Sequence, residues 1–207
     1  MAEAGINQVP DRRPPYYTTQ WDTILGCPHA GRRPSNRQQH ILEFTMSVTV
    51  ADFVNVAEQA IALGCPALEK IAVLPENFAT VRTAADFLQR SEADTVRKLF
   101  RLENVPTDDS KPFKAPYIQN NGFEWVGPLI FIGAGVISDN ANYVSVSLNL
   151  ISNFLYDFFK TSQGKNTVKL NIVVEKQSNK NCKLITYEGD VAGMSSLPDI
   201  IREVSFD

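Results

Sequence analysis

The strongest hydrophobic pattern in the chain lies at residues 127–160, which read GPLIFIGAGVISDNANYVSVSLNLISNFLYDFFK. Residues 128–137 form an uninterrupted run of apolar and small side chains. Residues 138–140 (Ser-Asp-Asn) are good helix caps, because their short side chains accept hydrogen bonds from the free N–H groups at a helix start. The pattern predicts a helical hairpin, with its second helix over 141–159.

The second predicted helix has two distinct faces. Apolar residues recur at spacings of four, three, four and three, and so share one face: Val144, Leu148, Ile151, Leu155 and Phe158. The opposite face is polar but uncharged: Ser145, Asn149, Ser152 and Tyr156. A helix face exposed to water usually carries Lys and Glu, so we expect this one to pack against another helix or another chain. These four polar residues are candidate interaction residues.

The segment 41–64 predicts a strand followed by a helix. Apolar side chains at every second position of 41–48 are typical of a half-buried strand. Thr49 and Asp52 resemble a capping box that would start the helix. One face of this helix would be apolar: Val50, Phe53, Val54, Ala57, Ala60 and Ile61. Gly64 is placed to end the helix in a left-handed conformation.

Three further helices are predicted before residue 103. The first covers 66–74, with Pro66 at its start and Pro75 stopping it. The others cover 77–90 and 92–102, and Ser91 with Asp94 would cap the last.

The C-terminal part predicts a β-hairpin and a helix. Apolar and polar residues alternate over 168–174, a turn follows at 177–181, and 182–188 forms the returning strand. Ser196 would cap the last helix, with Pro198 in its first turn. Its apolar face comprises Leu197, Ile200, Ile201 and Val204.

Together these patterns predict an α+β fold with at least five helices. It would have a helical N-terminal half, a central apolar helical hairpin, and a small antiparallel β-sheet with a C-terminal helix. Four segments are expected. Residues 1–40 form an extended Pro/Arg-rich arm, residues 41–103 a strand plus helical subdomain, and residues 104–126 a linker loop. Residues 127–207 form the helical hairpin, followed by the β-hairpin and the C-terminal helix. Strand 41–48 is a candidate third strand of the sheet.

The arm 1–40 has no hydrophobic period, but three apolar side chains could anchor it to the body or to a partner: Tyr17, Trp21 and Leu25. They are the second set of candidate interaction residues. Pro14, Pro15 and Tyr17 fit the short PPxY pattern that polyproline-binding modules recognise, although four residues match often by chance.

The amino-acid composition argues against some classes of function. The hydrophobic fraction of 43% and charged fraction of 21% are ordinary for a globular protein, and a net charge of −3 argues against a general nucleic-acid binder. Three widely separated cysteines, Cys27, Cys65 and Cys182, favour reduced thiols over a disulfide framework. The N-terminus has no apolar core of a secretory signal. These observations predict a cytoplasmic protein.

Few residues suit catalysis or metal binding. The only histidines are His29 and His40, and their spacing with Cys27 and Cys65 matches no standard zinc pattern. A nucleophile pair of His40 with Cys27 or Cys65 is a weaker interpretation than buried thiols. Residues 133–135 (Gly-Ala-Gly) lack the other residues of a nucleotide-binding loop, and more plausibly let two helices approach closely. We therefore predict no catalytic residue, no cofactor and no metal.

The resulting hypothesis is a non-catalytic protein–protein interaction or assembly subunit, whose partner is another protein or copies of itself. One alternative is an enzyme with a carboxylate site assembled across the fold. Another is a membrane-acting protein that inserts its apolar hairpin when triggered. Residues 128–138 are too short for a span, which needs roughly 20 apolar residues.

Overall fold

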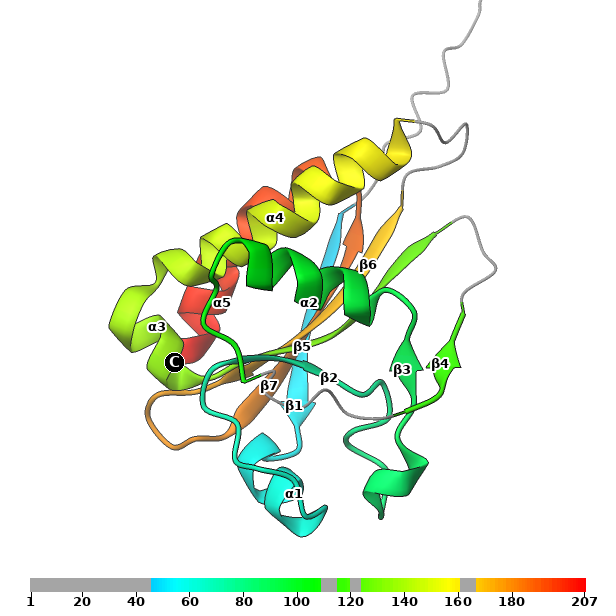
Figure 1. Ribbon diagram of the computed structural model, residues 1–207. Coiled ribbons are helices and arrows are strands. Elements are labelled where there is room, and N and C mark those ends of the chain that lie inside the picture. The colour runs from blue at the N-terminus through cyan, green and yellow to red at the C-terminus, as the bar shows by residue number, and fades with distance from the viewer. Residues whose placement is uncertain (1–45, 109–114, 120–123, 161–166) are drawn as a thin grey trace, which may run out of the picture. The chain divides into compact units, whose positions relative to one another are not determined.

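The computed structural model describes residues 46–108, 115–119, 124–160 and 167–207. Leu42–Asp207 form one compact unit. The fold is α+β: a mixed five-stranded sheet carries helices on both faces (Figure 1). The predicted arm 1–40 lies outside the described residues.

The sheet has the strand order β1-β7-β6-β5-β2. Its strands are β1 (Ser47–Phe53), β2 (Ile71–Leu74), β5 (Trp125–Ile132), β6 (Val168–Glu175) and β7 (Cys182–Gly189). All neighbouring strands are antiparallel except β5 and β6, which are parallel. The sheet is therefore mixed and larger than the predicted antiparallel one, and it includes strands from both 41–103 and 127–207.

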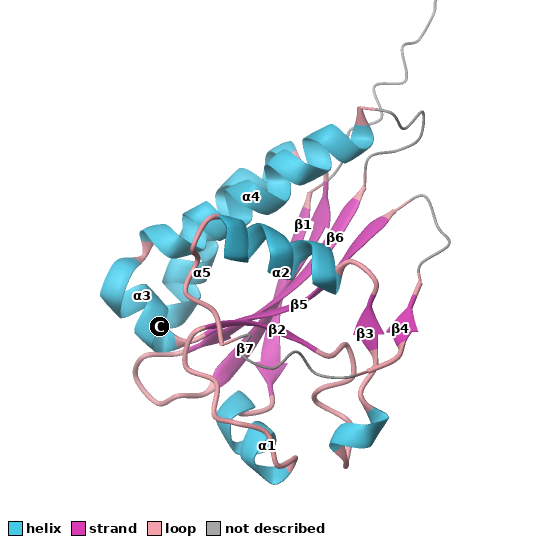
Figure 2. Cartoon of the chain, in the orientation of Figure 1, coloured by secondary structure: helices cyan, strands magenta, loops and turns pink. Residues whose placement is uncertain are grey.

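Two hydrophobic clusters cover the two faces of the sheet. The larger packs α2 (Ala93–Leu102), α3 (Ala134–Asn140), α4 (Asn142–Phe159) and α5 (Leu197–Phe206) on one face. The smaller packs α1 (Val56–Ala62) and neighbouring loops on the other. Figure 2 shows α4 lying along the sheet and α1 on the opposite side. β5 serves both clusters, because Ile130 and Ile132 face the larger one, whereas Leu129 and Phe131 face the smaller.

The predicted C-terminal β-hairpin and the helix after it are confirmed. β6 and β7 pair as an antiparallel hairpin from Val168↔Gly189 to Glu175↔Cys182. α5 follows, with a proline in its first turn and with Leu197 and Ile201 buried. The short 3-10 helix η2 (Ala192–Ser196) precedes it. Ser196 makes no side-chain capping bond to α5, because its hydroxyl donates to Gly193 O instead.

The first predicted strand lies further along the chain than expected. β1 runs over Ser47–Phe53 and pairs with β7, so Thr49 and Asp52 lie in a strand and form no capping box. The helix begins instead at Val56, where the Asn55 side-chain oxygen accepts from the Glu58 N–H at 3.1 Å. The β-branched residues of 47–53 favour an extended backbone, and the pairing of this segment with β7 stabilises it as a strand. Gly64 follows the helix with φ +69°, as predicted.

Residues 66–74 do not form the predicted helix. Their last four residues are β2, and all four side chains are buried. A short apolar run that is covered on both faces has no strand period, so the sequence pattern alone does not separate it from a helix.

Residues 77–90 also differ from the predicted helix. They contain the 3-10 helix η1 (Ala84–Asp86) and β3 (Gln89–Arg90), which pairs in parallel with β4 (Tyr117–Ile118). The Asn77 side chain closes the loop by donating to Asp86 O and accepting from the Leu88 N–H, both at 2.9 Å. The stacked rings of Phe78 and Phe87, with centroids 6.2 Å apart, fill its interior. Side-chain bonds and ring packing replace helical bonds here.

The predicted helical hairpin is half wrong. Its first arm is the strand β5 followed by the short helix α3, whereas its second arm is the predicted helix, α4. All eight residues of β5 are buried, between β2 and β6 and under both clusters. α2 agrees with the prediction for 92–102, but Ser91 and Asp94 do not cap it; its N-cap is Glu92, which makes no side-chain capping bond.

Candidate functional site

One stripe of α4 is buried in the core, and part of the opposite side of the helix is exposed. Val144, Leu148, Ile151 and Leu155 are buried as predicted. Phe158 is not, since 51% of it is exposed, and Phe159 at 6% takes the last core position. Both residues lie within one turn of Leu155, so helical spacing permits either, and packing against the core selects Phe159.

The structure separates the four predicted interaction residues of α4. Ser145 and Ser152 are half-buried beside η2 and α5 of the same chain. Ser152 donates to Leu148 O at 2.9 Å, and its hydroxyl lies 3.7 Å from Met194 Sδ. Asn149 and Tyr156 are exposed. Tyr17, Trp21 and Leu25 of the arm lie outside the described residues.

A row of apolar side chains on the outside of α4 was missed by the sequence reasoning. Val146, Leu150, Phe154 and Phe158 follow one another at intervals of four residues, and we call them the apolar ridge of α4. Val146 is 39% exposed and Phe158 is 51% exposed, while the two residues between them are half-buried. The rings of Phe154 and Phe158 lie 6.0 Å apart. The four-residue spacing is visible in the sequence, but only the structure shows that the two end residues of this row are exposed.

The helix that carries the apolar ridge is itself uncharged over most of its length. From Asn142 to Tyr156 the helix contains no Asp, Glu, Lys or Arg. Asn149 and Asn153 are the exposed polar neighbours. A neutral, partly apolar helix face of this kind is depleted of the charges that disfavour burial in a protein interface.

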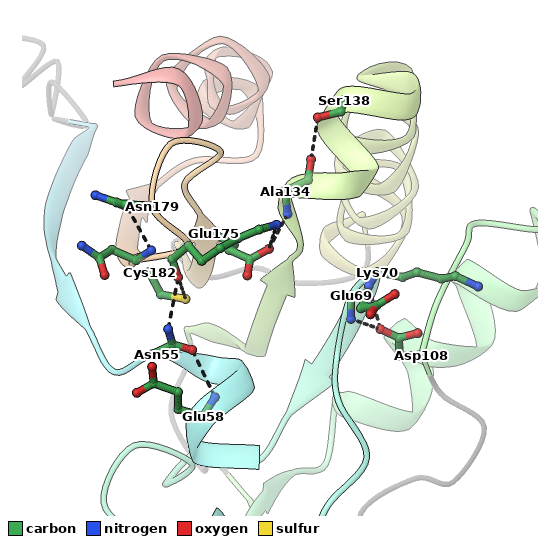
Figure 3. A network of polar contacts seen from close by, with 12 residues as sticks. Asn55, Glu58, Glu69, Lys70, Asp108, Ala134, Ser138, Glu175, Asn179 and Cys182 are labelled. Carbon is green, nitrogen blue, oxygen red and sulfur yellow. Dashed lines mark hydrogen bonds and ion pairs between the residues drawn. The ribbon is translucent and has the colours of Figure 1, made fainter. Parts of the chain in front are cut away.

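A second candidate site lies where the parallel strands β5 and β6 end. Both C-terminal ends lie at the same edge of the sheet, which is the usual position of ligand sites in sheets with parallel strands. Glu175 ends β6, and α3 begins directly after β5 and Gly133. Glu175 Oε2 accepts from the Ala134 N–H at 2.9 Å and lies 3.3 Å from the Lys180 ammonium nitrogen (Figure 3).

The loop before β2 crosses close to this edge. The Gly133 N–H donates to Lys70 O at 3.2 Å, and a Cβ on Gly133 would lie 2.1 Å from Glu69 O. Asp108 Oδ2 accepts from the N–H groups of both Glu69 and Lys70, each at 2.6 Å, and so fixes the loop (Figure 3). Gly133 therefore admits the backbone of a loop, whereas the sequence suggested that small residues here let two helices approach.

Between this loop, α1 and the end of β6 lies a cleft of about 440 Å³, which we call the Glu175 cleft. Its polar lining comprises Asn55, Glu58, Glu69, Glu175 and Lys180. Its apolar lining includes Ala57, Ile61, Ala67 and Leu68. These residues come from segments far apart in the sequence, so no local motif predicted the cleft.

Among the described residues, nothing supports a metal site or a reactive thiol. These residues contain no group of three or more His, Cys, Asp and Glu that could hold a metal ion. Burial raises the pKa of both the Cys65 and the Cys182 thiols, so neither is an activated thiolate at neutral pH. Three residues of the sequence-based zinc and nucleophile hypotheses lie outside the described part of the chain: Cys27, His29 and His40.

No family model, curated protein or solved structure matches this chain. Among the described residues, no helix combines the length and hydrophobicity that crossing a membrane requires.

Proposed function

We propose that this chain is a non-catalytic protein–protein interaction or assembly subunit that binds another protein, or another copy of itself, through the apolar ridge of α4. The observation that supports it is the exposure of Val146 and Phe158 in one row of a helix that has no charged residue from 142 to 156 and carries the Asp157–Lys160 ion pair only at its end. Exposed apolar side chains that gather in one place mark interaction surfaces more often than isolated ones do.

Leu150 and Phe154 of the ridge pack partly against the larger cluster, whereas Val146 and Phe158 are exposed. The inner face of α4 already fills the core with Val144, Leu148, Ile151, Leu155 and Phe159. Covering the ridge would remove further apolar surface from water, at about 25 cal/mol per Å² before the costs of association. The proposal places the protein in the cytoplasm, and the free cysteines Cys65 and Cys182 agree with a reducing compartment.

Matched aromatic variants test the proposal. Phe158→Asp adds a charge to the ridge, and Phe206→Asp makes the same change on α5, at a side chain that is 59% exposed. Sedimentation across a range of protein concentrations measures self-association, and affinity capture measures binding to other proteins. We expect Phe158→Asp to lose the complex that both the wild type and Phe206→Asp form, while all three unfold at similar denaturant concentrations.

Two results would overturn the proposal. One is a wild-type chain that stays monomeric at all concentrations and captures no protein. The other is a complex that forms equally well with Phe158→Asp.

A further inference from the structure

The two edges of the five-stranded sheet differ. At one edge lies β2, whose outer side bonds to the segment 106–108. The Ile71 N–H donates to Pro106 O at 3.3 Å, and Ile71 O accepts from the Asp108 N–H at 3.0 Å. The Arg97 guanidinium donates to Val73 O at 3.1 Å. These bonds occupy the backbone groups that a further strand would need, so this edge is closed to pairing.

The opposite edge, formed by β1, is open. Within the described part of the chain, no strand lies on the outer side of β1. Short length, prolines, lysines and bulges usually prevent an edge strand from pairing with another chain. β1 has seven residues without proline or lysine, and its pairing with β7 shows no bulge. Its one charged residue, Asp52, lies near its end and pairs with Lys183 at 2.7 Å. β1 therefore lacks these protections.

The side chains of β1 suit a further strand. Val50 is 49% exposed, although its cross-strand partner Ile185 is fully buried. Val48 lies on the same face of the strand as Val50 and packs partly against the larger cluster. The other face carries small, uncharged and exposed side chains: Ser47, Thr49 and Ala51. A strand beside β1 would cover Val50 on one face and meet only small side chains on the other.

We propose that β1 pairs in antiparallel orientation with β1 of a second copy of this chain, which joins the two five-stranded sheets edge to edge. The strand is complementary to itself when the two-fold axis passes through Thr49. Thr49 then lies opposite its own image, Val48 opposite Val50, and Ser47 opposite Ala51. The valines of both copies form one apolar group, and threonine and β-branched pairs of this kind stabilise neighbouring strands.

The charges of β1 agree with this arrangement. Asp52 lies opposite Met46 of the second copy, so the two Asp52 carboxylates lie at opposite ends of the strand pair and do not meet. Each is also paired with Lys183 of its own chain. Pairing of residues 47–51 gives about four to six backbone hydrogen bonds between the copies. A contact through one strand is smaller than a standard interface of about 1,600 Å², so the dimer should be weak.

Sedimentation of the full chain measures this dimer in the Phe158→Asp background, which removes the ridge contact. We expect a monomer–dimer equilibrium that Thr49→Lys and Thr49→Glu each weaken at least tenfold, because like charges then lie directly opposite each other. Thr80→Lys makes the same change at an exposed threonine outside β1 and should dimerise within twofold of its parent. A parent that stays monomeric up to about 1 mM, the weak end of specific binding, would overturn the proposal.

Mixing the two charged variants tests whether β1 meets β1. An equimolar mixture of Thr49→Lys and Thr49→Glu should associate at least tenfold more tightly than either protein alone, because opposite charges then face each other across the axis. A strand supplied by a different protein, or a dimer formed through another surface, would show no such recovery. A mixture that associates no better than its components contradicts the proposal.

Amide hydrogen exchange tests the same contact without a charged substitution in β1. In the Phe158→Asp protein, we expect exchange of some amides of 47–51 to slow as the protein concentration rises, while amides of β2 stay unchanged. Exchange in 47–51 that does not depend on concentration would contradict the β1 dimer. The inference does not depend on the apolar ridge of α4: Thr49→Lys should keep the complex formed through the ridge, and Phe158→Asp should keep the β1 dimer.

Discussion

Glu175 Oε2 accepts a hydrogen bond from the backbone N–H of Ala134 at 2.9 Å, which ties the end of β6 to the first residue of α3. Gly133, the N-cap of α3, has no side chain with which to cap the helix. A carboxylate 41 residues further along the chain supplies the acceptor instead. The same bond holds Glu175 in the wall of its cleft.

Removing this acceptor should destabilise the fold. We expect Glu175→Ala to lower the free energy of unfolding by about 1–3 kcal/mol, because the buried Ala134 N–H loses its partner. Glu175→Gln keeps an acceptor oxygen and should lose less. Urea unfolding of the three proteins measures the difference, and equal stability of Glu175→Ala and the wild type would show that the bond is not needed.

Two glycines at the start of α3 should respond differently to the same change. A Cβ on Gly133 meets Glu69 O at 2.1 Å, so Gly133→Ala must displace the loop, and we expect a loss of about 1–3 kcal/mol. In Gly135→Ala the same atom lies 3.8 Å away, an ordinary contact. Within a helix this change should be neutral or stabilise by up to about 1 kcal/mol. Thermal unfolding compares the pair, and equal losses would contradict the close approach at Gly133.

Two neighbouring positions on α4 separate its core from its surface. Leu148 is 3% exposed, so Leu148→Lys buries an unpaired charge at a cost of several kcal/mol, and we expect no folded protein by circular dichroism. Asn149 is exposed beside the apolar ridge, so Asn149→Lys should change stability by no more than about 0.5 kcal/mol. If Asn149 lies in a subunit contact, this variant should stay folded and lose assembly. A variant unchanged in both stability and size would remove Asn149 from the interface.

Stability should fall at alkaline pH because of Tyr187. Burial, followed by the nearby Asp190 carboxylate, raises the pKa of Tyr187 to about 12, from an ordinary value of 10.0. The folded state therefore favours the protonated phenol, whose hydroxyl donates to Asp190 O. Its contribution is complete below pH 10 and is lost as the pH rises towards 12, with a slope of at most about 1.4 kcal/mol per pH unit.

Chemical unfolding at several pH values checks this dependence. Tyr187→Phe removes the titrating hydroxyl, so its stability should fall less steeply over the same interval. Parallel curves for the two proteins would show that other groups cause the loss.

The sequence alone determined those elements whose hydrophobic period is long or whose burial is one-sided. The stripe from Val144 to Leu155 predicted α4, and the alternation over 168–174 predicted β6 and, with the turn after it, β7. α2 and α5 were predicted in the same way, because each has one apolar face and one polar face, and this arrangement appears in the sequence as the helical repeat.

Only the tertiary structure decided the conformation of the short apolar runs and the composition of both candidate sites. β2 and β5 are covered on both faces, so their residues show no alternation, and pairing with neighbouring strands makes them extended. At the end of α4, packing against the core buries Phe159 and leaves Phe158 exposed on the ridge. The Glu175 cleft is lined by residues from three distant segments. These residues come close together only because the parallel strands end at the same edge of the sheet, and no local sequence pattern predicts that.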